Sequence, residues 1–158
     1  MGRSDARRED VRASCGHSRR RRRSSLMHTI NLTAAWDHFE LPETNGDAAG
    51  WARWFGRPTG VEPPLEVWLV AATDLLNRLW LNGLPLRPVS AASDSERVTP
   101  QLTGRNRLLL PPAGVSLAVA RGLDHELTAG RIVTRRSVLP PHHGRVMLVI
   151  SEGTPVVP

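Results

Sequence analysis

The sequence predicts an all-β domain, a β-sandwich or jelly roll, with a disordered N-terminal tail. From residue 28 onward, short segments with alternating or continuous apolar residues follow one another, separated by clusters of Pro, Gly, Asn and Asp. In addition, no segment of ten or more residues shows a helical pattern. We therefore expect about seven to nine short strands in a sandwich over residues 27–151, between tails at 1–26 and 152–158.

The N-terminal half of the sandwich begins with alternating apolar and polar residues at 28–41, which predict half-buried strands. The turn formers around Asn45 and Gly46 then indicate a bend. Residues 51–58 are aromatic and β-prone, and they end at Pro58, which cannot donate to a strand ladder. The nearly continuous apolar run at 66–72 predicts a strand that is buried on both faces.

A hairpin is expected around Asn82 and Gly83. Residues 78–81 have the pattern of a strand, and a short returning strand ends at Leu86. An Asn-Gly pair supplies the two residues with positive φ that a type I′ turn requires. The pair is therefore predicted to be structural.

Beyond the hairpin, residues 87–96 are expected to form a loop, and 97–102 lead into Gly104. Residues 105–110 then predict a strand that ends at two prolines. Asn106 lies two positions after Gly104, and Asn side chains mimic turn hydrogen bonds, so we expect Asn106 to bind nearby backbone.

The C-terminal third contains two further strand signals. Val115, Leu117 and Val119 alternate with smaller residues, which predicts a strand over 115–120. Residues 122–130 fit no single pattern, whereas 145–151 predict a closing strand.

The order of these segments resembles the sugar-binding, jelly-roll domain at the N-terminus of family 2 glycoside hydrolases, a galactose-binding-like domain. The resemblance covers roughly residues 28–150. It is carried by four elements: the Arg-Trp-Phe-Gly-Arg-Pro segment at 53–58, the strand pair at 67–70 and 79–83, the segment 97–102 with Gly-Arg-Asn-Arg-Leu at 104–108, and the closing strand at 143–150.

The resemblance implies this fold and a sugar-related ancestry. Residues 111–140 match no element of the family, and the 158 residues do not include the barrel that carries its two catalytic carboxylates. The resemblance therefore implies no hydrolase activity.

Five tryptophans in a chain without tyrosine are the main candidates for ligand contacts. An indole ring stacks well on the apolar face of a sugar, and it also fills protein cores. Trp68 and Trp80 lie in the most apolar segments, where we expect core packing. Trp36, Trp51 and Trp54 have more polar neighbours and are the candidate ligand-binding residues.

No catalytic, cofactor or metal site is predicted. The adjacent His142 and His143 would point to opposite faces of a strand, and no third ligand stands at a recognisable spacing. The acidic pair around His125 suggests a triad, but no nucleophile motif accompanies it, so a solvated turn is expected there. Cys15 is the only cysteine, which excludes an intrachain disulfide and a thiolate metal site.

The charge of the chain lies in its tail. The net charge is +6, and residues 1–27 account for all of it with nine arginines against three acids. The rest of the chain is neutral and has no field to steer a polyanion. Five consecutive arginines, Arg19 to Arg23, are either a nucleic-acid or targeting patch, or part of a solvated tail upstream of Met27 as the true initiator.

Neither a signal peptide nor a membrane span is expected. Polar residues interrupt the segment after the arginines, and no window approaches the roughly 20 apolar residues that a span needs. We expect a cytoplasmic protein.

Two functional hypotheses follow. The first is a stand-alone, non-catalytic β-sandwich that binds a carbohydrate or a protein partner, and its test is whether tryptophan remains exposed on the folded domain. The alternative is a nucleic-acid-associated protein that binds through the arginines of its tail.

Overall fold

The computed structural model describes residues 28–41, 49–88, 90, 92–136 and 144–155. The expectations for the tail, for the bend at Asn45 and Gly46, and for His142 and His143 lie outside these residues. Within them, most regular structure is β, in two antiparallel sheets with few helices. The all-β prediction is confirmed at this level.

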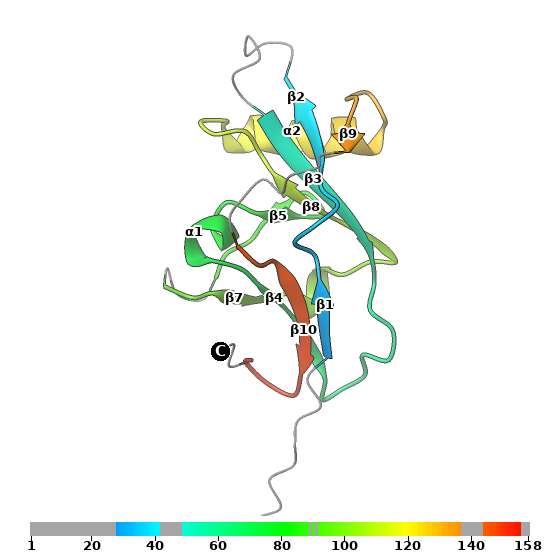
Figure 1. Ribbon diagram of the computed structural model, residues 1–158, viewed down its shortest axis with the longest axis vertical. Coiled ribbons are helices and arrows are strands. Elements are labelled where there is room, and N and C mark those ends of the chain that lie inside the picture. Colours follow the sequence, from blue (N-terminus) through cyan, green and yellow to red (C-terminus); the bar gives the residue numbers. More distant parts are fainter. Residues whose placement is uncertain (1–27, 42–48, 89, 91, 137–143, 156–158) are drawn as a thin grey trace, which may run out of the picture.

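One sheet has four strands, in the spatial order β1 (His28–Asn31), β10 (Met147–Ser151), β4 (Glu66–Val70) and β7 (Ser95–Arg97). The other has six, in the order β6 (Leu84–Pro85), β5 (Trp80–Leu81), β8 (Arg105–Leu110), β3 (Ala49–Gly56), β2 (Asp37–Glu40) and β9 (Arg135–Arg136). Figure 1 shows the four-stranded sheet at one end of the molecule, and β2, β9 and the upper part of β3 at the other.

In the part of the chain that the structure describes, three helical segments lie between strands. The short α1 (Thr73–Leu76) follows β4, a 3₁₀ helix (Thr99–Gln101) precedes β8, and α2 (Leu117–Thr128) lies beside β2 and β3 (Figure 1).

Strand β8 of the six-stranded sheet is buried on both faces. Leu108 and Leu110 belong to the main core, which also includes Leu69 and Leu148 of the other sheet. Leu109 points the opposite way, because successive strand residues alternate between faces, and it joins a second core that includes Leu123 of α2. This arrangement explains the continuous apolar run at the end of β8.

The predicted hairpin is confirmed. β5 and β6 pair with each other, and the two residues between them, Asn82 and Gly83, have φ values of 51° and 81°. Both lie in the left-handed region that a type I′ turn requires. The strand predicted at 105–110 is also confirmed, as β8.

The strand predicted at 115–120 is wrong, as is the expectation that no helix reaches ten residues. Residues 117–128 form α2, whose first turn is capped by the Ser116 side chain as it accepts a hydrogen bond from the Val119 N–H. Ala120, Leu123 and Leu127 share one helix face and are buried. Apolar residues at 115, 117 and 119 fit an alternating pattern, but Leu117 and Val119 are exposed.

Candidate functional site

The candidate tryptophans lie in three different environments. Trp36 is only 1% exposed, and its indole N–H donates to the Leu32 carbonyl at 2.9 Å. A ligand cannot stack on this ring, so the expectation of a binding role for Trp36 is wrong. Trp80 is buried, as predicted, whereas Trp68 is only half-buried.

Trp51 and Trp54 are both half-buried in β3, but they face opposite sides of the sheet. The guanidinium carbons of Arg105 and Arg107 lie 4.7 and 4.5 Å from the centre of the Trp54 ring. Trp54 is thus engaged in cation–π contacts within the protein. Trp51 packs against the main core, and its ring centre lies 5.8 Å from that of His38.

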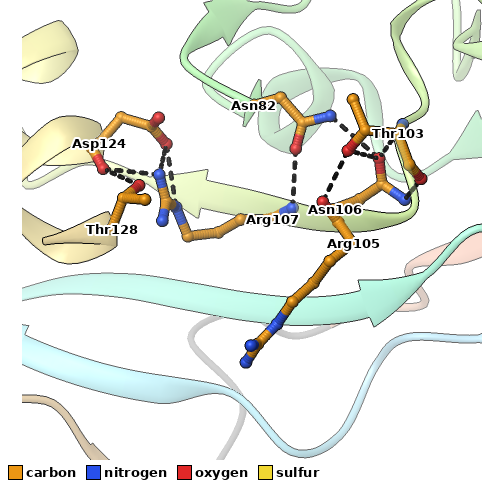
Figure 2. Close-up of polar contacts among 7 residues, drawn as sticks. All are labelled: Asn82, Thr103, Arg105, Asn106, Arg107, Asp124 and Thr128. Carbon is orange, nitrogen blue, oxygen red and sulfur yellow. Dashed lines mark hydrogen bonds and ion pairs between the residues drawn. The ribbon is translucent and has the colours of Figure 1, made fainter. Parts of the chain in front are cut away.

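The two asparagines singled out in the sequence form one hydrogen-bonded network (Figure 2). The Asn82 amide donates to Asn106 Oδ1 at 3.0 Å and to the Gln101 carbonyl at 2.8 Å, and its oxygen accepts from the Arg107 N–H. The buried Asn106 exchanges two further hydrogen bonds with the Thr103 backbone. The predicted structural roles of both asparagines are confirmed.

The two glycines near these asparagines differ. A Cβ on Gly83 would lie 3.0 Å from Asp124 Oδ2, which is a tight contact, and its φ is positive, so conformation and space both favour glycine. A Cβ on Gly104 would meet nothing within 4 Å, and nothing in the structure explains a glycine there.

A buried ion pair joins β8 to α2. Arg107 is 3% exposed, and its guanidinium donates to Asp124 Oδ1 at 2.9 Å and to the Asp124 carbonyl at 2.6 Å (Figure 2). Thr128 Oγ1 donates to the same carbonyl. The expectation of a solvated turn at 124–126 is therefore wrong, because these residues belong to α2. With its charges compensated inside the fold, the pair has a structural role.

A cleft of about 310 Å³ lies between β2 and the segment that leads from α2 into β9. The residues that line it are His38, Phe39, Glu40, Arg131, Ile132, Val133 and Arg135. His38 of β2 stands opposite Trp51 of β3 on one side and opposite Arg135 of β9 on the other. Trp51, His38 and Arg135 therefore form a row across three strands, here called the cleft row.

The His38 ring is fixed by β9. Its Nδ1 lies 3.1 Å from the Arg135 carbonyl oxygen. A carbonyl only accepts hydrogen bonds, so Nδ1 carries a proton and, in the neutral ring, Nε2 is an acceptor.

Two arginines near the cleft are paired with acids. Arg131 binds Glu126 through two hydrogen bonds of 2.5 and 2.7 Å, which raise the pKa of Arg131 and lower the pKa of Glu126. Arg136 Nε lies 3.2 Å from Asp37 Oδ1.

Two other charged groups line the cleft and do not belong to these ion pairs. Among the residues that the structure describes, the side chains of Arg135 and Glu40 form no hydrogen bond or ion pair. The cleft thus offers a donor, an acceptor carboxylate and an imidazole to a polar ligand.

Only part of this site was predictable from the sequence. Trp51 was a candidate, but neither His38 nor Arg135 was, because 97 positions separate these two residues and only the fold brings them together. Within the described ranges, no group of three or more His, Cys, Asp or Glu side chains could hold a metal ion. In the same part of the chain, no helix has the length and apolar character to cross a bilayer.

Comparison with family models, with curated proteins and with solved structures finds no match to this chain.

Proposed function

We propose that this chain is a non-catalytic β-sandwich of the jelly-roll, galactose-binding-like type that binds a carbohydrate in the cleft beside β2 and β9. The observation that carries the proposal is the cleft row, which places an aromatic side chain, an imidazole and a guanidinium side by side next to an open cleft.

The chemistry of the cleft suits a saccharide. Sugar hydroxyls both donate and accept hydrogen bonds, and the cleft supplies a carboxylate acceptor at Glu40 and a guanidinium donor at Arg135. Its volume of about 310 Å³ lies at the small end of ligand sites, which favours a short saccharide over a long chain. Trp51 lies behind His38 and supports the imidazole from the core side.

Binding of the 158-residue chain to a broad glycan panel tests the proposal, with His38→Ala and His28→Ala as matched variants. His28 is exposed in β1 of the other sheet, so the second variant removes an imidazole away from the cleft. We expect saturable binding that His38→Ala loses and His28→Ala keeps. Equal binding by both variants would place the site elsewhere, and a folded chain that binds no glycan would refute the proposal.

A protein partner is the second candidate function, and the edge strand β1 favours it. All four residues of β1 are exposed, including Ile30 at 39%, and among the described strands β1 pairs with β10 alone. An unpaired edge can accept a strand from another chain. Crosslinking of a cysteine placed at Thr29 in cell extract would capture such a partner, and an inward control at Leu148 would not.

Nucleic-acid binding remains a prediction that rests on Arg19 to Arg23, outside the described residues. Removal of residues 1–26 would then abolish a salt-dependent affinity for nucleic acid. An unchanged affinity after this truncation would contradict it.

A further inference from the structure

We infer that the saccharide bound in this cleft is acidic, and that Arg135 binds its carboxylate or sulfate group. The inference rests on the proposed carbohydrate-binding function and adds the chemical class of the ligand.

Arg135 differs from its neighbouring arginines in having no acidic partner. Arg131 is held by Glu126, and Arg136 is held by Asp37 and also donates to the Ala35 carbonyl at 2.7 Å. Among the described residues, the Arg135 side chain makes no such contact, although it is exposed and lines the cleft. Its five N–H donors are therefore available to a ligand.

The nearest acid in the cleft wall does not neutralise Arg135. Glu40 lines the same cleft, but its carboxylate is not within 4.0 Å of the Arg135 guanidinium. Arg–carboxylate pairs, where they form, are frequently bidentate. Because this pair does not form, the Arg135 guanidinium can bind an anion of the ligand, and Glu40 can accept hydrogen bonds from sugar hydroxyls.

Another arginine, Arg53, lies near this end of the sheet but does not line the cleft. Burial lowers the pKa of the Arg53 guanidinium, the nearby Arg136 lowers it further, and Asp37 raises it. Arg53 Nε is buried without a hydrogen-bond partner. In the cleft wall itself, among the described residues, Arg135 is the cation without an ion pair and Glu40 is the acid without one.

The cleft row indicates how the ligand is oriented, with its long axis along the row from Trp51 to Arg135. Neighbouring strands lie about 4.8 Å apart, so the row from Trp51 to Arg135 spans about 10 Å. A sugar ring placed against His38 would have its acidic substituent at Arg135. The backbone of Arg135 is held in place by its pairing with β2 and by the hydrogen bond from His38.

Calorimetric titration of the full chain with oligogalacturonate and with its methyl ester tests the inference, since esterification removes the charge and leaves the sugar unchanged. A sulfated oligosaccharide forms a third arm. We expect at least one acidic ligand to bind, and the methyl ester to bind roughly tenfold more weakly or not at all, because hydrogen bonds to charged groups contribute more than neutral ones. Binding by the sulfated ligand alone would identify sulfate as the anion.

Three charge variants locate the anion. Arg135→Gln should weaken acidic binding roughly tenfold, and Glu40→Gln should strengthen it by removing a like charge. Arg78→Gln, at an exposed position away from the cleft, should leave it unchanged.

The outcomes separate the two proposals. Equal affinity for the acid and its ester, or an unchanged affinity in Arg135→Gln, would overturn the acidic-ligand inference and leave carbohydrate binding in place. A folded chain that binds neither these saccharides nor any glycan of the broad panel would overturn carbohydrate binding itself.

Discussion

The ion pair between Arg107 and Asp124 is the contact whose loss we expect to be most costly. Asp124→Ala removes the carboxylate from a guanidinium whose side chain is only 4% exposed. Breaking a buried pair by removing one partner costs about 3–5 kcal/mol, because the other charge stays buried and uncompensated. Arg107 keeps its bond to the Asp124 carbonyl and its contact with Trp54, so we expect about 3 kcal/mol, the low end of this range.

The same helix provides a matched control. Glu126→Ala also removes a carboxylate that binds an arginine near the end of α2. Alanine raises helix propensity in both variants, more when it replaces Asp than when it replaces Glu, so the difference works against the predicted loss in Asp124→Ala. This pair is exposed and therefore screened by solvent, so no measurable loss is expected.

Urea unfolding of the full chain, followed by tryptophan fluorescence, measures both variants. The slope of the free energy of unfolding against urea should stay constant, so that a shift in midpoint reports stability alone. A loss in Asp124→Ala no greater than in Glu126→Ala would refute the reasoning, since the Arg107 guanidinium would then have to reach water.

Two further predictions concern β3 and β7. Gly50→Ala would place a Cβ 2.2 Å from the buried Phe39 ring and should lower the free energy of unfolding by about 1–3 kcal/mol. In the same strand, a Cβ on Gly56 would meet nothing within 4 Å, so Gly56→Ala should be neutral or slightly stabilising. Equal stabilities of the two variants would contradict this prediction. Burial raises the pKa of Glu96, so its ionised form costs stability above that pKa and costs none below the pKa of the unfolded chain. Glu96→Gln should therefore raise the thermal midpoint at pH 7 and leave it unchanged near pH ~3; a gain at both pH values would show that ionisation is not its cause.

Structure set by neighbouring residues was predictable from the sequence. The type I′ turn needs two consecutive residues with positive φ, and the Asn-Gly pair predicts this turn. The strand at 105–110 ends where prolines remove the backbone donors. In both cases, the controlling chemistry lies within a few residues of the element itself.

The helix α2 was missed because two periodicities overlap at its start. Three apolar residues at every second position fit a strand, and the same segment also begins the helical series of Ala120, Leu123 and Leu127. The cap at Ser116 and the later leucines distinguish the two, and the first residues alone do not.

The cleft was not predictable for a different reason. β9 is two residues long and pairs with β2 across nearly a hundred positions, so no local pattern marks Arg135 as a neighbour of His38. The aromatic composition likewise did not predict which tryptophans are exposed. Trp36 has polar neighbours in the sequence and is fully buried, because its indole N–H finds a backbone carbonyl inside the core.

Charge compensation separates the arginines that hold the fold from the one that we assign to a ligand. Arg107 is enclosed, and Asp124 and the Trp54 ring meet its charge within the protein. Arg135 is exposed at the wall of a cleft, and no acid among the described residues meets its charge. Burying a cation without a partner costs stability, whereas an exposed cation stays hydrated without one, and its unpaired donors remain available for binding. On this physical ground, the paired Arg107 belongs to the structure and the free Arg135 to the proposed site.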